Sequence, residues 1–393
     1  MSKLKVTTIS DPDNDNTALT IDTSGNVSVS QGFVPPTQLS HRNLIINGAM
    51  QVAQRGTSFT GLTNGSSEYT LDRFKFIESG NQTSVFTVSQ DTNTPDYFGN
   101  SLKLTCTTSG SGHNVIEITQ SIEAQNLQSL AFGTSNAKSF TLSFWVKCSQ
   151  SGTGNVSFYN LDALRQRAEN YTINVADTWE YKTITVSGDT SGAFNNDNGT
   201  GLGVYFPIAA STSYSSGSTG SWGSYSDGKR GAGMTIDLTT STSDYLQITG
   251  VQLEVGSVAT PFEHRSYGEE LVRCQRYYQE IEASGRQSSC IGYRKNANHI
   301  YPTSGQNYHL PVTMRSAPTF LNTGMPVTFT SLLNDNWVST NYANLGSYTS
   351  GHYFGTNSKG AWYDSTVPGD SPFPADTPIN ITFGEDFKLD AEL

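Results

Sequence analysis

The chain is poor in charged residues, in cysteine and in long apolar runs, and each shortage excludes a class of protein. Only 15% of its 393 residues are Asp, Glu, Lys or Arg, so long salt-bridged helices are not expected. No apolar run approaches the roughly 20 residues of a membrane-spanning helix. The four cysteines lack any CxxC pair, and we expect free thiols, with a bridge between Cys106 and Cys148 as the alternative.

Features of exported proteins, nucleic-acid binders and common enzymes are also missing. The start, MSKLKVTTIS, lacks the apolar core of a signal peptide, so we expect the chain to be made in the cytosol and not exported by that route. A formal net charge of −11 argues against nucleic acid as a partner. The motifs of nucleophilic, zinc-dependent and nucleotide-binding enzymes are missing, and the six histidines have no ligand spacing. We expect no catalysis, cofactor or metal; paired carboxylates that meet only in the fold are the alternative.

What the chain does have is glycine, serine, threonine, asparagine and aromatic residues, the composition of an all-β protein with many loops. It contains 37 Gly, 19 Tyr and 19 Phe. At least eight segments between residues 84 and 255 alternate apolar and polar residues, which predicts a two-sheet sandwich of jelly-roll type. Within FTLSFWVKC, Phe144 and Trp145 point to opposite faces, and we expect one of them to anchor the core.

We predict four parts. Residues 1–36 form an N-terminal β leader, too short to bury a core alone. Residues 37–265 form the jelly-roll sandwich, residues 266–284 a short connecting helix, and residues 285–393 a C-terminal β tip domain.

The connecting helix is the most informative segment. Ser266 and Glu269 predict a capping box at its start, and Gly250 in the preceding strand predicts a β-bulge. The helix carries a narrow apolar seam, which we interpret as the axis of a homotrimer. A helix that packs on its own domain is the alternative. The seam consists of Leu271, Cys274, Tyr278 and Ile281.

Two aromatic-rich segments are candidate binding surfaces. The loop-rich stretch from 187 to 233 carries Trp222 and Tyr225, which either stack on a sugar ring or pin the loop to the sandwich. The segment from 334 to 374 is expected to be irregular, and its part from Asn334 to Tyr363 to form a recognition surface. Its candidate contact residues are Trp337, Tyr342, Tyr348, Tyr353 and Trp362.

Three stretches resemble bacteriophage tail fibre and receptor-binding virion proteins. They are GVQLEVGSVATPFEHRSYGEELVRCQRYYQ at the junction, NLIINGAMQVAQRG with YTLDRF near the start of the sandwich, and LPVTMRSAPT with DAEL toward the end. The resemblance implies a virion protein that attaches to another virion protein through residues 1–36. It also implies non-covalent binding of a host-surface glycan or outer-membrane protein. A polysaccharide-degrading tailspike and a structural decoration of head or tail are the alternatives.

The sandwich also resembles the carbohydrate-binding modules attached to glycoside hydrolases. The order NGAM, FWVK, TWEYKTITV and then the last strand carries this likeness. Those modules commonly hold a structural calcium with an acidic residue after the first NG and another in the last strand. Here these positions are Ala49, Met50 and Gln51, and Thr249 and Gly250. This departure argues against calcium and also against sugar binding by this domain.

Overall fold

The computed structural model describes most of the sandwich and parts of the flanking segments. The described residues are 6–10, 17–25, 27–29, 40–281, 287–296, 299–302, 308–316, 318–321, 327–331, 339–342, 352–357, 360–365, 378–383 and 387–393. The chain divides into two compact units, Met1–Arg42 and Asn43–Leu393. The described part has no helix that is both long and apolar enough to cross a membrane.

The first unit holds a small antiparallel sheet, as the alternation in the leader predicts. Its three strands follow one another in the order of the sequence. They are β1 (Thr8–Ser10), β2 (Thr17–Ile21) and β3 (Val27–Val29).

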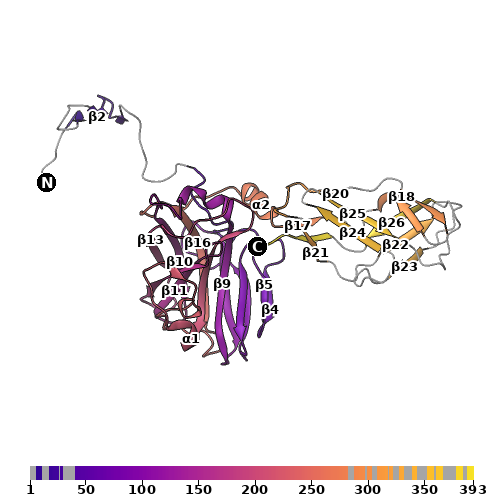
Figure 1. The fold of residues 1–393 in the computed structure, drawn as a ribbon, viewed down its shortest axis with the longest axis horizontal. Helices are drawn as coiled ribbons and strands as arrows, with labels where there is room; N and C mark the ends of the chain where they lie inside the picture. The colour runs from indigo at the N-terminus through magenta and orange to yellow at the C-terminus, as the bar shows by residue number, and fades with distance from the viewer. Residues whose placement is uncertain are drawn as a thin grey trace. The chain divides into compact units, whose positions relative to one another are not determined.

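The second unit is built on two antiparallel sheets that share one core (Figure 1). The six-stranded sheet has the order β13 (Glu180–Val186), β10 (Phe140–Cys148), β16 (Tyr245–Val255), β8 (Ser101–Thr108), β7 (Val85–Asp91), β4 (Ser58–Leu62). The seven-stranded sheet has the order β15 (Gly223–Ser224), β12 (Arg165–Ile173), β11 (Gly152–Asn160), β14 (Thr200–Ala210), β9 (His113–Glu123), β6 (Lys75–Gly80), β5 (Ser67–Tyr69). The predicted β-sandwich is confirmed.

Aromatic side chains join the two sheets. Phe144 of β10 is fully buried, and its ring meets Tyr171 of β12 edge-on at 5.2 Å and Phe206 of β14 at 5.3 Å between centroids. Such edge-to-face pairs add to the free energy of burial. Phe144 is therefore the core anchor, and Trp145 faces outward, as alternation along a strand requires.

Four short helical segments connect the strands of the sandwich and its junction. Two are α-helices and two are 3₁₀ turns. They are η1 (Ala124–Leu130), α1 (Thr212–Ser215), η2 (Asp227–Lys229) and α2 (Tyr267–Gln275).

The start of α2 is as predicted, but its length is not. Ser266 accepts from the backbone N–H of Glu269, whose side chain accepts from that of Ser266, so the capping box is confirmed. The helix ends at Gln275 and the chain continues as strand β17 (Tyr278–Ile281). The prediction that all four seam residues lie on one helix is therefore wrong. Only Leu271 and Cys274 belong to α2.

The physical reason lies in two tyrosines that pack on the sandwich. Tyr277 and Tyr278 are each 1% exposed, and the guanidinium carbons of Arg73 and Arg55 lie 3.4 and 3.8 Å from their ring centroids. The hydroxyl of Tyr277 donates to Glu123 at 2.6 Å. These contacts favour an extended chain over further helical turns.

The remaining strands form two sheets. The first has the order β17, β27 (Phe387–Asp390), β21 (Thr319–Phe320). The second has the order β20 (Tyr308–His309), β25 (Gly360–Ser365), β19 (His299–Pro302), β18 (Gln287–Asn296), β26 (Pro378–Phe383), β22 (Val327–Ser331), β23 (Ser339–Tyr342), and β24 (His352–Asn357) pairs with β25. Only the backbone is described in this second sheet. Strands β23, β24 and β25 lie inside the segment that we expected to be irregular.

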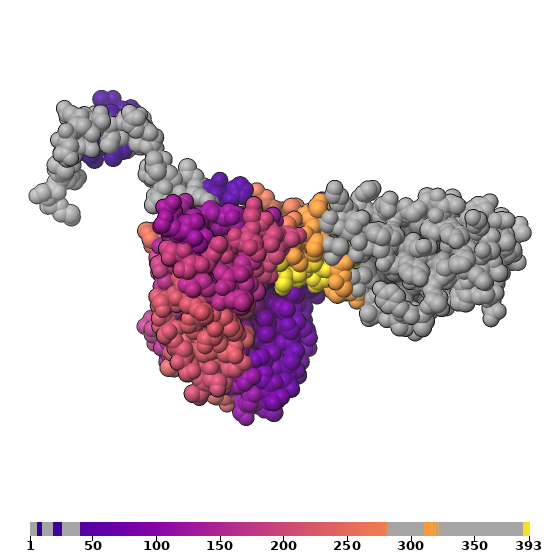
Figure 2. Space-filling view, in the orientation of Figure 1, coloured from indigo at the N-terminus to yellow at the C-terminus, as the bar shows by residue number. Residues whose placement is uncertain are grey.

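The last residues of the chain bind to the sandwich next to β17. Arg55 pairs with Asp390 at 3.0 Å, Arg73 pairs with Glu392, and the hydroxyl of Tyr69 donates to the backbone oxygen of Leu393 at 2.5 Å. Figure 2 shows the yellow C-terminal residues between the orange segment and the purple start of the sandwich. This end of the predicted tip domain is therefore part of the junction.

Three of the cysteines are described with their side chains. Cys106, Cys148 and Cys274 are buried free thiols. Strand β16 separates β8 from β10, so Cys106 and Cys148 do not face one another. Burial raises the pKa of the Cys148 thiol to about 11.

Candidate functional site

The outer face of the seven-stranded sheet carries a pocket of about 160 Å³. Four strands and the loop between β14 and β16 supply its walls. The lining residues are Ile77, Tyr159, Gln166, Tyr205, Tyr225 and Arg230. We refer to it as the Tyr225 pocket.

Strand register and one glycine bring the two sheet tyrosines together. Tyr159 of β11 pairs with Gln166 of β12 on one side and with Gly203 of β14 on the other. A Cβ atom at Gly203 would lie 2.5 Å from a ring carbon of Tyr205. Glycine at this position therefore makes room for the Tyr205 ring over its own strand.

Tyr225 closes the pocket from the loop side and is held by several contacts. Its backbone N–H donates to the oxygen of Leu164 at 2.9 Å, and its ring centroid lies 4.7 Å from that of Tyr159. Its hydroxyl donates to Asp227 at 2.6 Å. Burial and this hydrogen bond raise the pKa of Tyr225 above its ordinary value. Tyr225 is thus a fixed, neutral wall that is 39% exposed.

Arg230 is the cation of the pocket, and a buried carboxylate holds it. It pairs with Glu117 of β9, whose side chain is fully buried, whereas that of Arg230 is 17% exposed. Burial raises the pKa of Glu117, and the ion pair opposes that shift. Oε2 of Glu117 has no hydrogen-bond partner among the described residues. The guanidinium is therefore fixed by its partner and reaches water at one edge.

Trp222, the other candidate on this loop, does not line the pocket. Its indole N–H donates to the backbone oxygen of Ser187 at 2.8 Å, and its ring meets Phe132 edge-on at 5.5 Å. Trp222 pins the loop to the sandwich, and this anchoring positions Tyr225. Of the two alternatives from the sequence, Trp222 pins the loop to the sandwich. Tyr225 instead lines a pocket that a ligand could enter.

The candidate residues of the C-terminal domain are not described with their side chains. Trp337 and Tyr348 lie outside the described residues. Tyr342, Tyr353 and Trp362 lie in β23, β24 and β25, where the backbone alone is described. Their role as a receptor surface stays a prediction.

Sequence reasoning missed the residues that complete the pocket with Tyr225. Tyr159 and Tyr205 alternate with the buried Phe158, Val204 and Phe206. The period of two therefore placed both tyrosines on the outer face, and this signal was available. Nothing in the sequence pairs Arg230 with Glu117, because 113 positions separate them.

The positions at which the similar modules hold calcium do not fit that ion here. Met50 is fully buried in the apolar core, and the hydroxyl of Thr249 donates to the backbone oxygen of Asn100. Calcium requires several oxygen ligands, usually with carboxylates among them. The described residues contain no group of three His, Cys, Asp or Glu side chains able to hold a metal.

No family model matches the chain, and no curated protein matches it. Among solved structures, the enzymatically active domain of bacteriophage CBA120 tailspike protein 4 is 15% identical with a TM-score of 0.31, over 56% of this chain and 22% of that one. A xylan-binding domain of carbohydrate-binding module family 22 is 11% identical with a TM-score of 0.29, over 53% and 99%. TmCBM61, in complex with beta-1,4-galactotriose, is 10% identical with a TM-score of 0.27, over 55% and 99%.

At these identities and TM-scores, the similarities carry no conclusion on what the chain binds. The present chain spans about a fifth of the length of the tailspike chain.

Proposed function

We propose that the chain is a virion adhesin of the phage tail fibre type, and that the Tyr225 pocket binds one sugar unit of a host-surface glycan without cleaving it. The observation that carries the proposal is the arrangement of three tyrosine rings around a fixed guanidinium. Aromatic faces suit the apolar faces of sugar rings, and guanidinium N–H groups donate to hydroxyl or carboxylate oxygens. The small volume suits a single ring better than a chain.

The test is calorimetric titration with glycans from the host surface. Tyr225→Ala should weaken binding at least tenfold, because it removes one wall of the pocket, and tenfold corresponds to about 1.4 kcal/mol. Tyr225→Phe should retain most of the affinity, since the ring remains. Tyr267→Ala, at a tyrosine on α2 that is 56% exposed, is the matched control. Unchanged affinity in Tyr225→Ala would contradict the proposal.

The absence of cleavage is tested separately. Incubation of the protein with host polysaccharide should release no reducing ends. Release that is absent from a control without the protein and disappears when the protein is heat-denatured would favour the tailspike alternative instead.

Assembly and attachment belong to the same proposal. Three copies around one axis would cover the short leader strands and the exposed face of α2, where Val272 is 51% exposed. Light scattering should return three times the chain mass; a value near 42.5 kDa would contradict the trimer. Deleting residues 1–36 should leave a folded protein that no longer enters virions.

We also propose that the C-terminal domain contributes to host recognition. The resemblance to phage fibres and the density of aromatic residues support this. Separate alanine substitutions at Tyr342, Tyr348 and Tyr353 should lower adsorption to host cells without lowering Tm. Early melting with normal adsorption would assign these residues to a core.

A further inference from the structure

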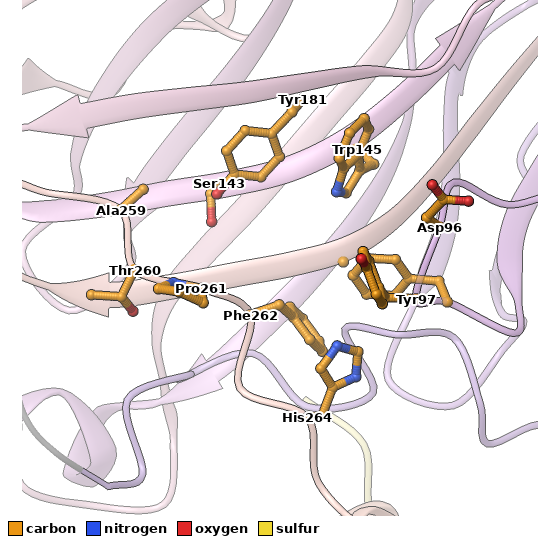
Figure 3. A pocket seen from close by; sticks show the side chains of 12 residues that line it. Asp96, Tyr97, Ser143, Trp145, Tyr181, Ala259, Thr260, Pro261, Phe262 and His264 are labelled. Atoms are coloured by element: carbon orange, nitrogen blue, oxygen red, sulfur yellow. The ribbon is translucent and has the colours of Figure 1, made fainter.

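A larger concavity lies on the outer face of the six-stranded sheet, on the other side of the sandwich from the Tyr225 pocket. Its volume is about 640 Å³, which falls within the range of small-molecule binding sites. Rings supply most of its walls. They belong to Tyr97, Phe98, Trp145, Tyr181, Phe262 and His264 (Figure 3). We refer to it as the Trp145 groove.

A bulge in β16 forms its floor. The register between β10 and β16 shifts between Ser143 and Trp145, opposite Gly250, whose φ is +62°. A Cβ atom at Gly250 would lie 2.7 Å from the ring of Phe98. The glycine therefore permits both the left-handed backbone and the seating of Phe98 against the strand.

Two aromatic walls face each other across this floor. On one side, the rings of Trp145 and Tyr181 lie 5.3 Å apart. On the other, Phe98, Phe262 and His264 form a cluster with centroid distances of 4.9 to 5.3 Å. Figure 3 shows Trp145 and Tyr181 along one side of the space and the loop residues along the other.

Tyr97 has a strained backbone conformation. Its φ is +73°, an uncommon value for a bulky residue, and its side chain is 91% exposed. Strained residues of this kind occur preferentially where a ligand is clamped.

The polar groups of the groove restrict the ligand. Of the described residues that line it, Asp96 alone is acidic and none is Lys or Arg. An anionic ligand is therefore disfavoured. Two polar groups of the groove, the Asp96 carboxylate and the Trp145 indole N–H, form no hydrogen bond to another described residue. The hydroxyls of Tyr97 and Tyr181 and the ring of His264 add further donors and acceptors.

A peptide strand is also disfavoured by the sheet. Peptides that add a strand need a free sheet edge. The floor of the groove lies over β10 and β16, and each of these strands is already paired on both sides. Of the edge strand β13, only the Tyr181 side chain lines the groove, from the face of the sheet. Aromatic faces with a few hydrogen-bonding groups between them suit a chain of uncharged sugar rings instead.

We infer that the Trp145 groove is a second glycan site, and that it binds an uncharged oligosaccharide chain between the Trp145 and Phe262 walls. The inference places a second glycan site on the opposite face of the sandwich. It rests on the proposed function only for the choice of a glycan as the ligand. The two sites differ in chemistry: the Tyr225 pocket offers a cation to one ring, and the groove offers aromatic faces to several.

The experiment follows the indole resonances of the full chain labelled at its five tryptophans. The protein is titrated with uncharged linear hexasaccharides built from glucose, mannose, xylose, galactose or N-acetylglucosamine. The Trp145 resonance, assigned by its loss in Trp145→Phe, should shift with at least one of them, while that of Trp222 stays in place. Trp145→Ala and Tyr97→Ala should each lower affinity for that sugar about tenfold, and Tyr267→Ala should not.

Two results would overturn the inference. One is a Trp145 resonance that moves with none of the five hexasaccharides; the other is unchanged affinity in both Trp145→Ala and Tyr97→Ala. Binding that Tyr225→Ala abolishes and Trp145→Ala leaves intact would refute the groove and retain the proposed function. The converse result would retain the groove and refute the Tyr225 pocket.

Discussion

Replacing Arg230 by methionine tests whether the cation of the Tyr225 pocket is held by a buried charge. Arg230→Met leaves the carboxylate of Glu117 in a fully buried position without its partner. Breaking a buried pair costs about 3–5 kcal/mol, and the partial exposure of Arg230 favours the lower end. A loss of about 3 kcal/mol corresponds to roughly 6–12 °C in Tm for a domain of this size.

The double variant separates the charge from the loss of packing. In Glu117→Gln/Arg230→Met no buried charge remains, so most of the lost stability should return relative to Arg230→Met. Urea unfolding of the four proteins, with m-values compared to check that unfolding stays two-state, gives the coupling free energy. Glu117→Gln alone is the matched control for the change at position 117.

The pH dependence has a defined sign. Because burial raises the folded-state pKa of Glu117 above its unfolded value, the folded state binds the proton more tightly. Stability from this group therefore falls as pH rises from about 4.3 through the folded pKa. Arg230→Met raises that pKa further, so its penalty should be larger at pH 7 than at pH 5. Equal losses at both pH values, or in both Glu117 backgrounds, would refute the reasoning.

Three further predictions concern the junction, the groove and the leader. Glu123→Gln should lower the free energy of unfolding by about 2 kcal/mol at pH 7. Burial raises the pKa of Glu123, but hydrogen bonds from Arg276 and Tyr277 outweigh it and lower the pKa. The loss should therefore shrink below pH 4 in acid titrations of unfolding, and a loss that stays constant would contradict the prediction. Gly250→Ala should lower the free energy of unfolding in urea by about 1–3 kcal/mol, because the added Cβ meets the Phe98 ring. An unchanged urea midpoint would show that the bulge relaxes to make room. Removing residues 1–36 should leave the Tm of the second unit unchanged, and a lower Tm would show that the leader stabilises it.

Much of the fold was predictable because its signals are local. Alternation along segments such as FTLSFWVKC assigned the strands and also the opposite faces of Phe144 and Trp145. The capping box at Ser266 and the bulge at Gly250 each depend on a few neighbouring residues. The end of α2 was not predictable in this way. Three-to-four spacing continues to Ile281, but Tyr277 and Tyr278 are held by arginines about 200 positions earlier in the chain.

The same distinction between local and long-range information applies to the proposed binding surfaces. The sequence by itself determined that Trp145 and Phe144 point to opposite faces, and the same period of two separates Tyr159 and Tyr205 from their apolar neighbours. The structure decided that Phe144 is the residue that faces the core. Only the tertiary structure decided which of the outward-facing side chains share a surface. Strand order placed Tyr159 beside Tyr205, loop contacts brought Tyr225 over them, and the bulge at Gly250 opened the floor beside Trp145. Each of these depends on pairing between distant segments, and composition and spacing carry no information about which distant segments pair.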